Sequence, residues 1–171
     1  PLEGSSGIKA GDNTYVHLVI VGMSRMGVAM AIEAAHMAHY PNYEEIGVRT
    51  RITFIDQNAA GEKEFFMGRF KDLFSLSHWR YGNVAERTLI WEKEHEVSGS
   101  NHLGGDFIDI EWEFINGSIE NAAVQQYLLE SSSDENAKLT VAICLPENSR
   151  AIAAAAYMPD ELYRSQNTLQ V

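Results

Sequence analysis

Four stretches of the chain have the apolar pattern of β-strands. Residues 16–21 and 139–145 are almost continuously apolar, which is typical of strands that are buried on both faces. Residues 51–56 (RITFID) are rich in β-branched and aromatic side chains and end on a carboxylate. Residues 107–115 (FIDIEWEFI) alternate, with three acidic residues on one face, and this alternation predicts a half-exposed strand near a sheet edge.

Helical periodicity follows each of these strands. Apolar residues spaced three and four apart predict a helix over about 27–40 and a second helix around 66–74. A third helix is predicted after Ser118, the expected N-cap, and a fourth over 147–158 (ENSRAIAAAAYM). The predicted order is therefore strand–helix–strand–helix, an insertion, and strand–helix–strand–helix again.

This alternation predicts an α/β domain with a Rossmann-like, doubly wound, mostly parallel sheet and helices on both faces. We expect the single domain to occupy residues 16–171, with an insertion at about 75–106, where the periodicity fades. Residues 1–15 show no periodicity and are interpreted as a linker or a remnant of cloning. Residues 167–171 (NTLQV) resemble the start of a further strand, so we expect the fold to be truncated at its C-terminus.

The loop after the first strand has the spacing of a dinucleotide-binding loop, G-x-G-x-x-G, with Ser24 in place of the second glycine. In such loops the first glycine, here Gly22, makes the tight turn, and the third, here Gly27, lets helix and strand pack closely. The pyrophosphate then lies on free N–H groups at the positive end of the helix dipole. Ser24 is small and adds a hydroxyl donor, so the pattern predicts a working phosphate loop.

An acidic residue ends the second strand, as the dinucleotide-binding pattern requires. Asp56 stands 29 positions after Gly27, further than the usual separation of about 20, and the loop before the second strand accounts for the excess. A carboxylate at this place accepts hydrogen bonds from the adenosine ribose and disfavours a 2′-phosphate. The expected cofactor is therefore NAD(H) or another adenine nucleotide, with NAD(H) favoured over NADP(H).

The composition narrows the classes of partner. The formal charge is −11, with 24 acidic and 13 basic residues, which argues against nucleic-acid binding. No apolar run approaches the length of a membrane span, so no direct membrane insertion of this chain is expected. The single cysteine, Cys144, lies in an apolar run and favours a reducing, cytoplasmic location. The six histidines have no zinc-site spacing, and we predict neither catalytic nor metal-binding residues.

Three stretches together resemble the TrkA-N or RCK (regulator of potassium conductance) domain: HLVIVGMSRMGVAMA, RITFIDQN and LTVAICLPENSRAIAAAAYM. The resemblance covers about half of the chain and implies an NAD-binding regulatory module of potassium uptake systems or channels. It also implies a homo-oligomer or an attached membrane or regulatory domain. By this resemblance, Asp56 and Gln57 would contact the adenosine, and Leu145 and Pro146 would close over the nucleotide. The residues that it places at the pyrophosphate are Gly22, Met23, Ser24, Arg25, Met26 and Gly27.

The first functional hypothesis is a sensor domain that binds NAD(H) or another adenine nucleotide, performs no chemistry, and controls the transport of potassium or another ion. The alternative is the cofactor-binding half of an NAD-dependent oxidoreductase. A third hypothesis is a methyltransferase, because a glycine loop with a strand-end acid also suits S-adenosylmethionine. It ranks lowest because the spacing from Gly22 to Gly27 favours a pyrophosphate.

Overall fold

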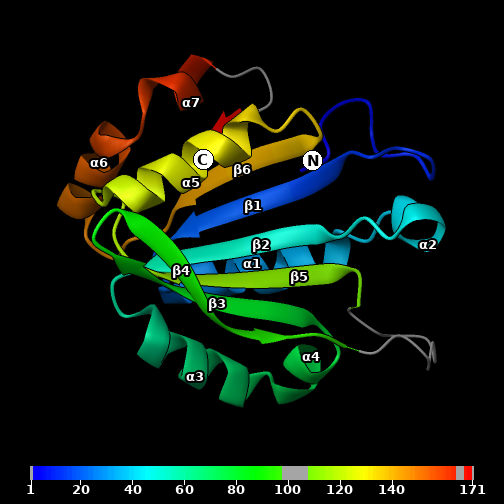
Figure 1. Cartoon of the computed structure of the whole chain (residues 1–171), viewed down its shortest axis with the longest axis horizontal. Helices are drawn as coiled ribbons and strands as arrows, with labels where there is room; N and C mark the ends of the chain where they lie inside the picture. Colours follow the sequence, from blue (N-terminus) through cyan, green and yellow to red (C-terminus); the bar gives the residue numbers. More distant parts are fainter. Residues whose placement is uncertain (1, 98–107, 165–167, 171) are drawn as a thin grey trace.

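The computed structural model describes residues 2–97, 108–164 and 168–170 and shows a Rossmann-like α/β fold (Figure 1). Helices follow four of the described strands, and two other strands form a hairpin. The elements are β1 (Tyr15–Val21), α1 (Arg25–Met37), α2 (Asn42–Ile46), β2 (Thr50–Asp56), α3 (Ala59–Arg69), α4 (Lys71–Ser75), β3 (His78–Ala85), β4 (Thr88–His95), β5 (Ile110–Asn116), α5 (Ala122–Ser133), β6 (Ala137–Ile143), α6 (Asn148–Tyr157), α7 (Asp160–Arg164) and β7 (Thr168–Gln170).

The described strands form one sheet in the order β4-β3-β5-β2-β1-β6-β7. Its neighbouring strands are parallel except for β3 and β4, which form an antiparallel hairpin. From β1 the chain goes to β2 and then to β3 and β4, which lie two and three places further along the sheet. β5 fills the place between β2 and β3, and β6 lies on the other side of β1. The order of the strands therefore reverses between β1 and β6, and the predicted doubly wound, mostly parallel sheet is confirmed. β7 pairs with β6, so the further strand predicted near residue 168 is also present.

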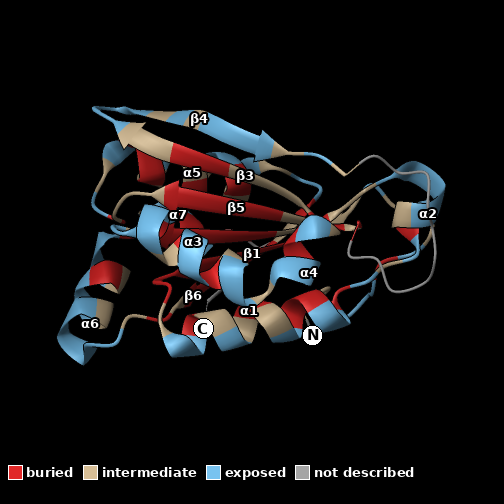
Figure 2. Ribbon diagram, turned by 90° about the horizontal axis from the view of Figure 1, so that it is seen from below, coloured by how far each residue is buried: buried red, intermediate tan, exposed pale blue. Residues whose placement is uncertain are grey.

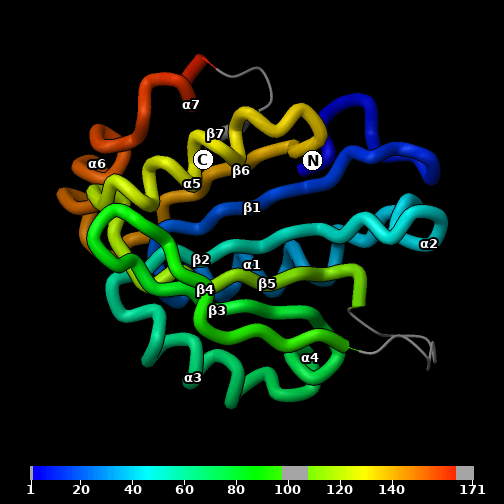
Figure 3. The backbone as a smooth tube through the Cα atoms, in the orientation of Figure 1, coloured from blue at the N-terminus to red at the C-terminus, as the bar shows by residue number. Residues whose placement is uncertain are grey.

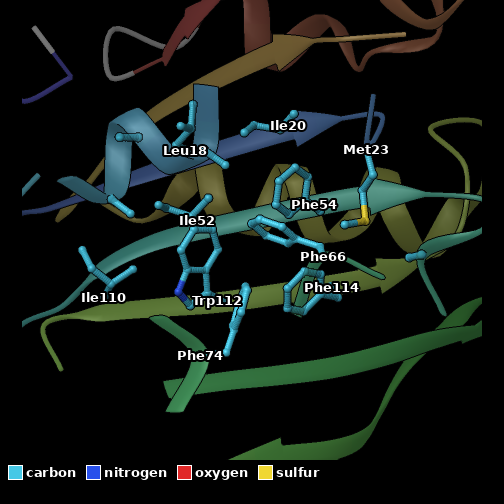
Figure 4. Close-up of a cluster of buried hydrophobic side chains, with 14 of the residues drawn as sticks. Leu18, Ile20, Met23, Ile52, Phe54, Phe66, Phe74, Ile110, Trp112 and Phe114 are labelled. Atoms are coloured by element: carbon cyan, nitrogen blue, oxygen red, sulfur yellow. The ribbon is translucent and has the colours of Figure 1, made fainter. Parts of the chain in front are cut away.

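Helices cover both faces of the sheet (Figures 1 and 2). On one face, the apolar side chains of β1, β2 and β5 pack against α1, α3 and α4 in an aromatic-rich core (Figure 4). Phe66 of α3 lies at the centre of this core, with its ring centroid 5.7 Å from those of Phe54 and Trp112. On the other face, α5, α6 and α7 cover the alternate side chains of the same strands. Among the described residues, no helix is both long and apolar enough for a membrane span.

β5 is an interior strand with most of its residues buried, so the prediction of a half-exposed strand near a sheet edge at 107–115 is wrong. It lies between β2 and β3, and the hairpin strand β4 takes the edge position. The acidic face of β5 is not simply exposed to solvent, because Glu113 is fully buried between two arginines of the neighbouring strands. The alternating acidic residues of this strand therefore indicate a face that forms ion pairs with neighbouring strands, not a face exposed to solvent. Residues 98–107, which include Phe107, lie outside the described part of the chain.

Glu113 is the centre of a buried polar network under α5. Its carboxylate accepts hydrogen bonds from Arg80 Nε (2.8 Å), Thr53 Oγ1 (2.7 Å) and the Tyr127 hydroxyl. Thr53 Oγ1 also lies within hydrogen-bond distance of His17 Nε2, at 2.9 Å. Burial lowers the pKa of His17 to about 4. Burial alone would raise the pKa of Glu113, but Arg51 and Arg80 hold it below its usual value, so the carboxylate stays charged.

The network connects the hairpin to the Rossmann core. Arg80 lies on β3, and its guanidinium also stacks over the Trp91 ring of β4, 3.9 Å from the centroid. β3 and β4 fall within the insertion expected at about 75–106, of which residues 98–106 are outside the described part. The insertion therefore extends the main sheet by two strands.

Three of the predicted helices differ in their bounds. The helix expected over about 27–40 begins at Arg25 and ends earlier, at Met37. The helix expected around 66–74 is divided into α3 and α4, because Phe70 between them leaves the helical conformation (φ −119°, ψ 47°). The helix expected after Ser118 begins at Ala122 instead. Asn121 is its N-cap, and the Asn121 side chain accepts a hydrogen bond from the Ser118 N–H at 2.7 Å, which makes residues 118–121 a separate turn.

Candidate nucleotide site

A cavity of about 410 Å³ lies at the carboxyl ends of the central strands. The loops after β1, β2, β5 and β6 all reach this edge of the sheet (Figure 3). Backbone hydrogen bonds hold these loops together just beyond the strands: Gly22 N–H donates to Ile55 O (2.9 Å), and Gly117 N–H donates to Asp56 O (3.0 Å). The cavity therefore occupies the position where doubly wound sheets bind ligands, beside the reversal of strand order.

The two loop glycines are required by close backbone packing. Gly22 has φ +103°, and a Cβ there would lie 2.9 Å from the carbonyl oxygen of Cys144. At Gly27 a Cβ would meet the Gly22 carbonyl oxygen and would lie 3.0 Å from Cγ2 of Ile20. These contacts agree with the roles of the first and third glycines in a dinucleotide loop, namely the tight turn and the close packing of helix on strand.

Ser24 is the N-cap of α1. Its Oγ accepts a hydrogen bond from the Gly27 N–H at 3.2 Å, and its backbone is extended (φ −69°, ψ 171°). The hydroxyl can still donate its own hydrogen, and Ser24 lines the cavity. The serine at the second glycine position therefore has a structural reason, and the donor that the sequence predicts for a phosphate remains available.

Asp56 connects the glycine loop to the end of β2. One carboxylate oxygen accepts a hydrogen bond from Met23 N–H (2.8 Å), and the other accepts one from Asn58 N–H (2.8 Å). The sequence predicts contacts with a ribose for this carboxylate, and the structure adds these two backbone contacts. Each oxygen has a second lone pair, so Asp56 can accept further hydrogen bonds from ligand hydroxyls while it holds the loop.

The cavity brings together most of the residues predicted for the site. Those that line it are Gly22, Met23, Ser24, Asp56, Gln57, Leu145 and Pro146. Gly27 is buried beneath the loop and does not line the cavity. Arg25 and Met26 are exposed; neither lines this cavity, and Arg25 instead lines a groove between α1 and α3.

The cavity is also lined by residues that the sequence does not predict for the site: Val21, Ile55, Asn58 and Glu62 at the ends of β1 and β2 and at α3, and two further groups. Residues 117–120 follow β5 and form the wall of the cavity next to Asp56. Gly117 marks this turn in the sequence, and a Cβ there would lie 2.8 Å from Cγ2 of Val84. Arg150, Ala153 and Ala154 of α6 form the opposite wall. Their position on the cavity depends on how α6 packs, for which the alanine-rich stretch gives no signal.

Charges are unevenly distributed around the cavity. The carboxylates of Asp56, Glu62 and Glu120 lie at the end of β2, on α3 and in the loop after β5. Three helices that begin at the same edge of the sheet, α1, α5 and α6, have no acidic residue in their first turns. The positive ends of these helix dipoles and Arg150 favour an anion, while the carboxylates favour hydroxyl and amine donors.

Comparisons with family models, with curated proteins and with solved structures found no match to this chain. The likeness to the TrkA-N or RCK domain therefore depends on the three stretches quoted above. The structure adds the Rossmann-like fold and shows that residues of all three stretches meet at one cavity.

Proposed function

We propose that this chain is a regulatory domain that binds NAD(H) in the cavity at the carboxyl edge of its sheet. The observation that carries the proposal is the contact between Asp56 and the glycine loop, with both groups lining one cavity. A nucleotide that spans them would place its phosphates at the start of α1 and its ribose at Asp56.

The lining residues suit recognition of a nucleotide more than chemistry on it. Backbone N–H groups and hydroxyls are donors for phosphate oxygens, and carboxylates are acceptors for ribose hydroxyls. Ile119 and Leu145 add apolar surface for a base or a second ring. The oxidoreductase alternative has no comparable observation in its favour, because it needs a substrate-binding unit in addition to this cavity.

Helix α6 is the element that would transmit nucleotide binding to a partner protein. Its Arg150, Ala153 and Ala154 line the cavity, and Ala154 is the one buried residue of the helix. On its outer side, Ile152 and Tyr157 are exposed by 72% and 53%. A ligand that contacts both the α1 loop and α6 would fix this lightly packed helix and its apolar outer surface. We propose that an attached or partner protein reads this change, with ion transport as the process that the TrkA-N/RCK resemblance implies.

Calorimetric titration with NAD, NADH, NADPH, ATP and S-adenosylmethionine tests the proposed function. We expect NAD or NADH to bind the wild-type chain and NADPH to bind at least tenfold more weakly, because a 2′-phosphate would lie beside Asp56. Asp56→Asn should weaken NAD binding by several-fold. This substitution keeps one oxygen acceptor but places an amide donor against either Met23 N–H or Asn58 N–H.

Asp72→Asn is the matched control, because Asp72 lies on α4 and outside the cavity. Its affinity for NAD should equal that of the wild type. Binding of S-adenosylmethionine without NAD would favour the methyltransferase hypothesis. Absence of binding by all five ligands would show that the proposed function is wrong.

A further inference from the structure

Arg150 is the cation nearest to the proposed ligand. Among the residues that line the cavity, it is the one with a positively charged side chain, alongside three carboxylates. Within the described part of the chain, its guanidinium forms no ion pair with any carboxylate. Arg150 is exposed to solvent and unpaired within this part of the chain, so its guanidinium is available to an anion that enters the cavity.

Resting on the nucleotide function proposed above, we propose that Arg150 binds the phosphates of the nucleotide and supplies their counter-charge from α6. The guanidinium presents a planar set of donors that matches two phosphate oxygens at once. Because Arg150 is in the first turn of α6, the same phosphates also meet the positive end of that helix dipole. The phosphates would then lie between the N-termini of α1 and α6.

This assignment differs from the one implied by the TrkA-N/RCK resemblance, in which Arg25 lies at the pyrophosphate. Arg25 is exposed and lines the groove between α1 and α3, together with Glu33, Phe65 and Arg69. Its backbone N–H remains at the start of α1, where it can serve the phosphate loop. Its side chain lines this neighbouring groove, which shares Met23 and Glu62 with the cavity, and it does not line the cavity itself. The proposal therefore assigns the side-chain cation of the site to α6 instead of the glycine loop.

The test compares Arg150→Gln with Arg25→Gln in the 171-residue chain, using calorimetry with NAD and with adenosine. Adenosine has the base and ribose of NAD but no phosphate, so it isolates the interaction proposed for Arg150. We expect Arg150→Gln to weaken NAD binding by about tenfold or more and to leave adenosine binding unchanged. Arg150→Lys should recover part of the affinity, because it restores the charge without the paired donors. Arg25→Gln should change the affinity for NAD by less than about threefold.

Thermal unfolding of each variant checks whether the fold is kept. Arg150 is exposed, so its replacement should not disturb packing. Equal NAD affinity of Arg150→Gln and wild type would overturn the assignment while leaving the nucleotide function intact. A larger loss for Arg25→Gln than for Arg150→Gln would overturn it in favour of the loop arginine. Failure of both NAD and adenosine to bind the wild type would instead contradict the proposed function itself.

Discussion

At the scale of single residues, the glycine loop depends on two positions where no side chain has room. Gly22 has a positive φ where the backbone passes close to the Cys144 carbonyl, just after β6. Gly27 lets α1 lie directly against the loop and β1. Both requirements concern the backbone and exist without a ligand. The loop therefore contributes to folding stability as well as to the proposed site.

Gly27→Ala should lower the free energy of unfolding by about 1–3 kcal/mol, because the added methyl group would press on Gly22 and Ile20. Gly68→Ala is the matched control. Gly68 lies in α3 with no atom within 4 Å of an added Cβ, so alanine there should leave the stability unchanged or raise it by up to about 1 kcal/mol. Urea unfolding of both variants measures the difference. Equal stability of the Gly27→Ala variant and the wild type would contradict the close packing of α1 at Gly27 against Gly22 and Ile20.

Most of the candidate site could be predicted from the sequence because its residues follow strands directly. Ser24 and Asp56 each come within a few positions of a recognisable apolar run, and the parallel arrangement brings such residues to one edge. Arg150 has no such signal. An arginine in an alanine-rich helix is usually a solvated surface residue, and only the packing of α6 against the loops places this one at the cavity.

At the scale of elements, the network around Glu113 holds β5, β3 and α5 together. It joins residues far apart in sequence: Glu113 and Arg80 are separated by 33 positions, and Thr53 and Tyr127 by 74. Periodicity reports which residues share a face of one strand, but it does not report the charges on the strand beside it. For this reason the sequence predicts β5 as a strand and misplaces it in the sheet.

The same network should make the stability of the fold depend on pH. The pKa of His17 is about 4 in the folded chain and 6.5 in an unfolded chain, so the unfolded state binds more protons between these values. The stability that His17 contributes is therefore present above pH 6.5 and is lost as the pH falls towards 4. The loss should amount to about 3 kcal/mol. The lowered pKa of Glu113 adds a loss of the same sign in more acidic solution.

Urea unfolding between pH 7 and pH 4 measures this dependence, with His17→Gln as the comparison. The variant should show a flatter fall of stability over the window, since it removes the titrating group while keeping an amide donor near Thr53. Titration of the imidazole signals of the wild type by NMR provides an independent check. A histidine signal assigned to His17 that titrates near pH 6.5 would contradict the buried, neutral imidazole.

At the scale of the whole molecule, the chain is a Rossmann-like unit with one addition at the sheet edge. The order β5-β2-β1-β6-β7 gives the doubly wound core and places the reversal beside β1. The alternation of strands and helices predicts this core. The β3-β4 hairpin lies beyond β5, away from the reversal. β3 contains arginine, glycine and asparagine, and the apolar run of β4 is only three residues long, Leu89 to Trp91, before charged residues follow, so neither has the pattern from which a long strand is recognised.

The central claim is that an adenine dinucleotide occupies the cavity between the glycine loop, Asp56 and α6. Amide NMR spectra of the ¹⁵N-labelled chain, recorded during addition of NAD, test it most directly. We expect the largest shifts at residues 22–24, 56–58, 117–120, 145, 150, 153 and 154, which line the cavity, and little change in β4 or α4. Unchanged spectra, or shifts confined to the α1–α3 groove around Phe65 and Arg69, would contradict the claim.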